Sequence, residues 1–89
     1  MDRIRKHFIF HGDVQGVGFR WNAKYTAQHY GISGWVRNNY DGTVEMEAEG
    51  TPLDLAALVE ELKNARWVRV ETIDEKTIPA EGGYGFEIR

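Results

Sequence analysis

The sequence contains no cysteine, only two prolines and no long apolar run. The absence of cysteine excludes disulfide bridges and thiolate metal sites. No stretch approaches the roughly 18 to 20 apolar residues that a membrane-spanning helix requires. Positive charge is not in excess either: the formal net charge is −3, whereas a general nucleic-acid-binding protein normally presents a basic face. Any anionic ligand must therefore be held by a local arrangement of groups rather than by the overall field of the protein.

The length of 89 residues predicts one domain spanning residues 1–89, because a chain of this size can fold alone around one modest core. No linker or low-complexity run divides it. The basic N-terminal residues are not followed by an apolar segment long enough for a secretory signal. We therefore expect a cytoplasmic monomer without a membrane or nucleic-acid partner.

Hydrophobic periodicity and turn residues predict five strands and two helices. The expected strands are residues 4–11, 32–38, 43–49, 67–73 and 84–88. The first helix begins at Phe19 and ends before Gly31, since glycine favours helix C-termini. The second helix has Thr51 as its N-cap and Pro52 at its first position.

The order strand–helix–strand, repeated once and followed by a tail, is typical of an α+β fold. It indicates the ferredoxin-like split βαβ sandwich, with one antiparallel sheet and two helices on one face. In this arrangement strands 4–11 and 32–38 run parallel. The turn at Asp41-Gly42 joins strands 32–38 and 43–49 as a hairpin.

The segment Gly12 to Gly18 lies between the first strand and the first helix. Glycines let successive backbone N–H groups turn inward, and a helix N-terminus adds unpaired donors and a positive dipole end. This combination predicts a site for a phosphate-sized anion. It lacks the Gly-Lys-Ser/Thr of a Walker A loop and the spacing of a dinucleotide-binding fingerprint. The alternative interpretation is a flexible connection.

Arg20 follows the loop directly, in the first helical turn. A cation at this position opposes the helix dipole, unless an anion lies between them. The guanidinium can then bind two phosphate oxygens at once. The alternative is an ordinary exposed helix arginine.

Asn38 ends the strand that precedes the hairpin. Because strands 4–11 and 32–38 run parallel, this strand end lies at the same edge of the sheet as the glycine loop. The side-chain amide has a donor and an acceptor, so it can hold a water molecule beside a bound phosphate. Asparagine is also common in turns, and the alternative interpretation is that Asn38 and Asn39 shape the turn.

The three histidines give no metal site. His7 and His11 lie four residues apart on a strand, about 13 Å, which is too far for one metal ion. We interpret them and His29 as surface or edge residues, and we expect no metal and no cofactor.

Two further groups of side chains receive structural interpretations. Because acidic residues outnumber basic ones, packing in the core or at its rim is favoured over base stacking for the tryptophans Trp21, Trp35 and Trp67. Alternation with period two predicts a solvated strand face for the glutamates Glu45, Glu47 and Glu49.

Residues 12–20 read Gly-Asp-Val-Gln-Gly-Val-Gly-Phe-Arg, and residues 34–38 read Gly-Trp-Val-Arg-Asn. Together with Gly42, Val44 and Gly50 at matching spacing, these segments closely resemble the two signatures of the acylphosphatase family. The resemblance covers essentially the whole chain, including the Phe-Glu-Ile-Arg ending at residues 86–89.

The resemblance implies a ferredoxin-like fold and metal-independent hydrolysis of small acyl phosphates to a carboxylate and inorganic phosphate. Arg20 corresponds to the phosphate-binding arginine, and Asn38 to the asparagine that orients water. The phosphate cradle corresponds to the backbone amides of Gln15, Gly16, Val17, Gly18, Phe19 and Arg20. The substrate's own phosphate is expected to accept the proton of the water. We expect a free-standing enzyme rather than part of a larger carbamoyltransferase.

Two other functions stay open from the residues alone. The same loop could bind an anion without turnover, as in a regulatory module. An RNA-binding module shares the topology, but the aromatic signature that such domains carry on their central strands is missing. Acetyl phosphate, carbamoyl phosphate and glycolytic acyl phosphates all present the same group to the loop, so the physiological substrate is not identified.

Overall fold

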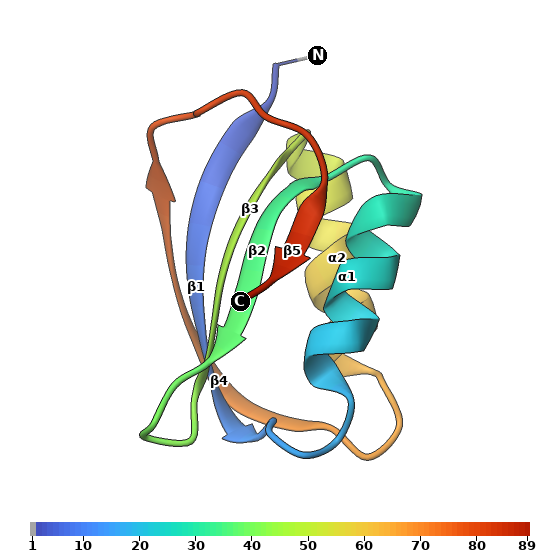
Figure 1. Ribbon diagram of the computed structural model, residues 1–89, viewed down its shortest axis with the longest axis vertical. Coiled ribbons are helices and arrows are strands. Elements are labelled where there is room, and N and C mark those ends of the chain that lie inside the picture. Colours follow the sequence, from blue (N-terminus) through green and yellow to red (C-terminus); the bar gives the residue numbers. More distant parts are fainter. Residues whose placement is uncertain (1) are drawn as a thin grey trace.

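A computed structural model describes residues 2–89, and its two helices cover one face of a five-stranded sheet (Figure 1). The elements in chain order are β1 Ile4–Asp13, α1 Phe19–His29, β2 Ser33–Asn38, β3 Val44–Gly50, α2 Pro52–Lys63, β4 Arg69–Ile78 and β5 Phe86–Ile88. These elements confirm the predicted α+β fold. None of the helices in the described residues is long and apolar enough to span a membrane.

The strand order in the sheet is β4-β1-β3-β2-β5. β1 pairs antiparallel with β3 and β4, and β2 pairs antiparallel with β3, so β1 and β2 run in the same direction as predicted. The prediction of a purely antiparallel sheet is wrong at β5, which pairs with β2 in parallel. The reason is that the chain crosses from one edge of the sheet to the other after β4 and enters β5 at the end where β2 begins (Figure 1).

β4 also differs from its prediction. It covers Arg69–Ile78 rather than residues 67–73. Its backbone pairs with β1 along almost its whole length, from Asp13 opposite Arg69 to Arg5 opposite Ile78. This long-range pairing extends the strand through polar residues that show no strand pattern of their own.

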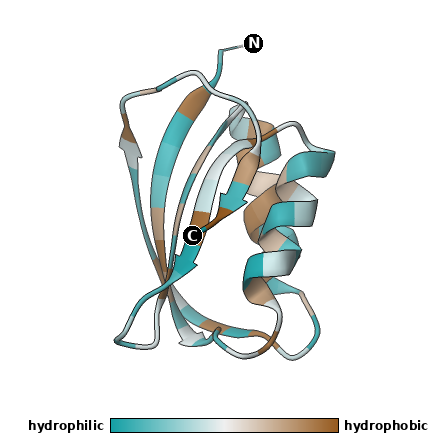
Figure 2. Ribbon diagram, viewed as in Figure 1, coloured by the Kyte–Doolittle hydropathy of each residue, from teal (hydrophilic) through white to brown (hydrophobic). Residues whose placement is uncertain are grey.

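The helix ends follow the predicted local signals. Gly31 has a φ of 68° just after α1, the left-handed conformation that glycine adopts without strain. The Thr51 hydroxyl accepts a hydrogen bond from the Asp54 N–H at 3.2 Å, and Pro52 begins α2. Hydrophobic and hydrophilic residues follow one another along both helices, as expected of elements with one buried face (Figure 2). The helix residues that are buried against the sheet are Phe19, Ala23, Ala27, Leu55, Leu58 and Leu62.

The sheet face opposite the helices is charged but not freely solvated. Glu49 is only 2 % exposed, and the Arg5 guanidinium pairs with Glu47 at 2.8 Å and with Glu49 at 3.3 Å. His7 lies 2.7 Å from Glu45, and this hydrogen bond holds the pKa of Glu45 below its usual value. The predicted solvated glutamate row is therefore wrong, because basic side chains of the neighbouring strand lie opposite it.

The tryptophans divide into two groups. Trp35 is buried on the charged face, where its ring lies 5.3 Å from the Arg37 guanidinium and 5.0 Å from that of Arg89. Trp21 and Trp67 are 54 % and 78 % exposed. The prediction of packing therefore holds for Trp35, and the other two rings expose more than half of their surface.

Trp67 also has an unusual backbone. Its φ is 71°, and no other non-glycine residue among residues 2–89 has a positive φ. The left-handed conformation brings Cβ too close to the following carbonyl oxygen and costs roughly 1–2 kcal/mol. Because the ring is largely exposed, little packing offsets this strain.

We expect Trp67→Gly to raise the free energy of unfolding by about 1 kcal/mol, since glycine adopts this conformation without the Cβ clash. Urea unfolding of the purified variant measures the change. Trp67→Ala is the matched control: it removes the ring, keeps Cβ and should show no gain. Equal losses in both variants would mean that contacts of the ring outweigh the backbone strain.

Candidate functional site

The glycine loop and the β2–β3 turn lie side by side at one end of the sheet, and Gln15 joins them. Its side-chain Nε2 donates to the carbonyl oxygens of Asn39 at 2.8 Å and Thr43 at 2.9 Å. The structure therefore brings the predicted anion-binding loop next to the strand end that carries Asn38. This contact was not predicted from the sequence, from which only the backbone amide of Gln15 was expected to take part. A long amide side chain inside a glycine-rich loop is the one signal that could have indicated it.

The loop is anchored in the core at both ends, and its two glycines are exposed. Val14 and Phe19 are each 1 % exposed and belong to the core, whereas Gly16 and Gly18 are exposed. These glycines have φ values of 75° and 79°, a region that other residues adopt only at a cost. A Cβ atom at either position would meet nothing within 4 Å. The glycines are therefore required by the backbone path rather than by lack of space.

The N-terminus of α1 lacks the usual side-chain cap. Gly18 occupies the N-cap position, no side chain caps the helix, and no acidic residue lies in its first turn. The first helical hydrogen bond runs from the Asn22 N–H to the Gly18 carbonyl at 3.0 Å. The N–H groups at the start of α1 therefore have no helical carbonyl to bind, and together with the helix dipole they favour an anion.

Arg20 lies in this first turn and is half-buried. Within residues 2–89 its guanidinium makes no hydrogen bond and no ion pair, whereas Arg37 pairs with Glu45 at 2.8 Å. A partly buried cation at the positive end of a helix raises the local potential. The surroundings of Arg20 are therefore suited to a ligand that carries negative charge.

Asn38 is half-buried at the end of β2. Because side chains alternate between the two faces of a sheet, Asn38 lies on the same face as Val36, which is fully buried beneath the helices. Its Oδ1 atom is buried and has no hydrogen-bond partner among the residues that the structure describes. A buried amide oxygen usually has a partner, so this atom is suited to accept a hydrogen bond from a bound water molecule or ligand.

The turn after β2 is built by other residues. The Asn39 N–H donates to the Thr43 carbonyl at 2.9 Å, and its side-chain amide donates to the Thr43 hydroxyl at 3.1 Å. The Asp41 carboxylate accepts from the Thr43 hydroxyl at 2.6 Å and from its N–H at 3.0 Å. These bonds hold the pKa of Asp41 below its usual value. Asn38 contributes no side-chain hydrogen bond to the turn, which weakens the turn-only interpretation.

Two of the histidines lie away from this end of the sheet, whereas His11 lines a hollow there together with Asp13 and the turn residues Asp41 and Thr43. His7 contacts Glu45, and His11 lies 2.9 Å from Asp74 of β4. His29 lies at the far end of α1, with its ring packed edge-on against Tyr30. Within residues 2–89 no three His, Cys, Asp or Glu side chains are grouped closely enough to hold a metal ion.

Comparison with known proteins identifies relatives that match nearly the whole chain. The acylphosphatase family model matches residues 6–88. An acylphosphatase of a Synechococcus species is 42 % identical, with 99 % of this chain and 95 % of the relative covered. An acylphosphatase of Thermococcus kodakarensis is also 42 % identical, with 99 % and 98 % covered. The crystal structure of acylphosphatase from Bacillus subtilis superposes with a TM-score of 0.91 at 36 % identity, covering 97 % of this chain and 98 % of that one. The chain therefore belongs to the acylphosphatase family.

Proposed function

We propose that this acylphosphatase hydrolyses small acyl phosphates with Arg20 and Asn38 as its catalytic side chains. The observation that carries the assignment is the presence, at one end of the sheet, of two groups that have no partner among the described residues. One is the Arg20 guanidinium, and the other is the buried Oδ1 of Asn38. Gln15 joins the loop that precedes α1 to the turn that follows β2.

The phosphoryl group of the substrate is held by the loop and by Arg20. The backbone amides of residues 15–20 donate to its oxygens, supported by the positive end of α1. The planar guanidinium of Arg20 binds two oxygens together and reduces the repulsion that an incoming nucleophile meets. As negative charge shifts during phosphoryl transfer, these fixed donors stabilise it without reorganising.

Asn38 holds the attacking water. Its Oδ1 accepts a hydrogen bond from the water and orients the water oxygen toward phosphorus. The water oxygen forms a bond to phosphorus while the bond between phosphorus and the acyl oxygen breaks, and the electron pair leaves with the carboxylate. A phosphate oxygen of the substrate takes the proton of the water. The products are a carboxylate and inorganic phosphate.

The reaction requires no general acid, because the leaving carboxylate has a conjugate acid with a pKa of about 4, like that of a side-chain carboxyl. The task of the protein is to position the water and to stabilise charge. For this reason we propose a reaction without metal or cofactor. We also propose a cytoplasmic monomer, acting as one domain over residues 1–89 on small molecules and without a nucleic-acid partner.

The purified chain should hydrolyse acetyl phosphate and benzoyl phosphate, with inorganic phosphate as a competitive inhibitor. Competition is expected because the loop recognises the phosphate that substrate and product share. Steady-state kinetics at several phosphate concentrations, with sulfate as a second anion, measure it. Binding of phosphate without any turnover of either substrate would indicate the regulatory anion-binding module instead.

Arg20→Lys should lower kcat by on the order of 10³-fold or more, the range seen when a cationic arginine is lost from a transferring phosphoryl group. Lysine keeps the charge but lacks the two-pronged geometry. Its inhibition constant for phosphate should rise as well. Arg66→Lys, at an exposed arginine beyond α2, is the control and should leave both constants unchanged. Near-normal turnover in Arg20→Lys would mean that the residue supplies only diffuse charge.

Asn38→Ala should lower kcat at least about 10²-fold, by analogy with a donor removed from an oxyanion site. Phosphate affinity should stay near that of the wild type, since the lost interaction belongs mainly to the transition state. Asn39→Ala offers a matched comparison, because Asn39 builds the turn; it should lose about 1 kcal/mol of stability and keep its turnover. The reverse pattern, an active Asn38→Ala that unfolds more easily, would assign Asn38 to the turn.

A further inference from the structure

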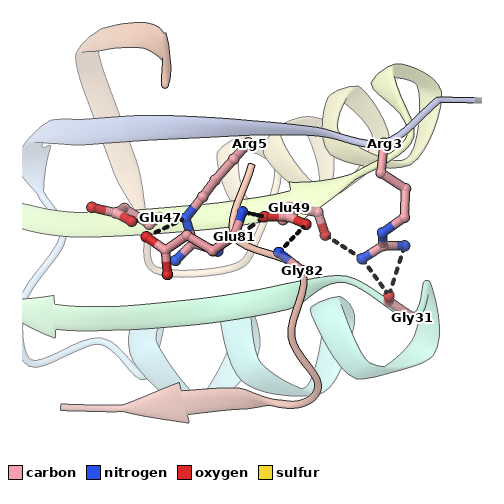
Figure 3. Close-up of polar contacts among 7 residues, drawn as sticks. All are labelled: Arg3, Arg5, Gly31, Glu47, Glu49, Glu81 and Gly82. Carbon is pink, nitrogen blue, oxygen red and sulfur yellow. Dashed lines mark hydrogen bonds and ion pairs between the residues drawn. The ribbon is translucent and has the colours of Figure 1, made fainter. Parts of the chain in front are cut away.

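The segment between β4 and β5, residues 79–85, crosses the end of the sheet and is held on its charged face by Glu49. We call this segment the strap. The side chain of Glu49, on β3, is 3 % exposed. Its Oε1 accepts from the Glu81 N–H at 2.8 Å, and its Oε2 accepts from the Gly82 N–H at 3.0 Å (Figure 3). Both carboxylate oxygens of one buried side chain are thus bound to the backbone of the strap.

Other charged groups surround this contact and keep Glu49 in place. Arg5 of β1 lies 3.3 Å from Glu49, 2.8 Å from Glu47 and 3.5 Å from Glu81. The Arg3 guanidinium donates to the backbone carbonyl of Glu49 at 2.9 Å (Figure 3). One buried arginine thus lies among three glutamates. Arg5 and the strap amides together compensate the buried charge of Glu49.

The strap leads directly into β5, which supports β2. The Gly34 N–H of β2 donates to the Gly85 carbonyl at 3.0 Å, and the Arg89 N–H donates to the Val36 carbonyl at 2.8 Å. β5 has only three residues, too few for a stable strand without further anchoring. The pairing reaches Val36, two residues before Asn38.

β5 also contacts α1. Its Phe86 is 3 % exposed and belongs to the core that includes Phe19 and Ala23 of α1. β5 thus lies against both elements that carry the proposed catalytic side chains, α1 with Arg20 and β2 with Asn38.

We propose that Glu49 is a positioning residue for the hydrolysis: by holding the strap, it keeps β5 in place and so fixes β2 and α1 relative to each other. This inference rests on the proposed roles of Asn38 and Arg20. Glu49 acts from the face of the sheet opposite the helices and takes part through β5, not by contact with the substrate.

The role requires a carboxylate. Two N–H groups converge on the two oxygens of Glu49, and a glutamine would present an NH₂ group to one of these donors. The hydrogen bonds from Glu81 and Gly82, with the nearby Arg5, hold the pKa of Glu49 below its usual value. The stability that this carboxylate contributes is therefore present above its unfolded-state pKa and is lost as the pH falls through the lower folded-state pKa.

The test compares Glu49→Gln with Glu47→Gln, using hydrogen exchange and kinetics. Glu47 lies on the same face and pairs with Arg5 but accepts no hydrogen bond from the strap among the described residues. In Glu49→Gln we expect the amides of Glu81, Gly82 and Arg89 to exchange at least about 10-fold faster, since a hydrogen bond to a charged group is lost. With acetyl phosphate, kcat should fall about 10-fold, while the inhibition constant for phosphate changes less. Glu47→Gln should keep both strap protection and kcat.

Each outcome decides the proposal. Faster exchange of the strap with an unchanged kcat would overturn it, because the strap would then be only structural. Equal falls of kcat in the two variants would also overturn it and indicate a general effect of charge. If the wild type turns over no acyl phosphate, the proposed function itself fails, and the positioning role falls with it. Should Glu49→Gln not fold, Glu49→Asp keeps the charge with a shorter reach and is measured in the same way, with the same outcomes.

Discussion

The arrangement of the site depends on the side-chain amide of Gln15. Its Nε2 donates hydrogen bonds to two carbonyl oxygens of the β2–β3 turn, that of Asn39 at 2.8 Å and that of Thr43 at 2.9 Å. Apart from Gln15, only Val17 of the loop between Val14 and Phe19 packs against the core, because the two remaining residues are glycines without side chains. With Gln15 in place, the loop and the turn that follows Asn38 form one unit. A shift of either segment must stretch these two hydrogen bonds.

The two faces of the sheet serve different purposes, and β3 connects them. On the helix side Val44, Met46 and Ala48 are fully buried and contribute to the apolar core. The alternate residues of the strand carry the carboxylates that bind Arg5, His7 and the strap. A buried ion pair contributes little net stability, because desolvation offsets its attraction. In this structure both oxygens of Glu49 accept N–H groups of the strap, and with the strap in this place β5 pairs with β2.

The features predictable from the sequence are those set by local chemistry. Thr51 and Pro52 before an apolar stripe indicate the start of a helix, and Gly16 and Gly18 indicate the loop. Gly12, which was predicted to begin the loop, lies in β1 instead. Asn38 could be placed beside the loop from the direction of two strands alone. The environment of Glu49 could not be predicted, since its partners lie 44 residues earlier, at Arg5, and 32 residues later, at Glu81. The parallel pairing of β5 escaped prediction for the same reason: a three-residue strand has no periodicity, and its place is decided by distant contacts.

One charged group at this end of the sheet works against stability, because an arginine near a helix N-terminus has an unfavourable charge–dipole interaction. Asn38 Oδ1 has no hydrogen-bond partner among the described residues. The other buried unpartnered side-chain atom in the described residues is the Ser33 hydroxyl oxygen, at the opposite end of β2. An anion on the loop would offset the unfavourable interaction of Arg20 with the helix dipole. Binding of inorganic phosphate at this end of the sheet should therefore raise the stability of the folded chain.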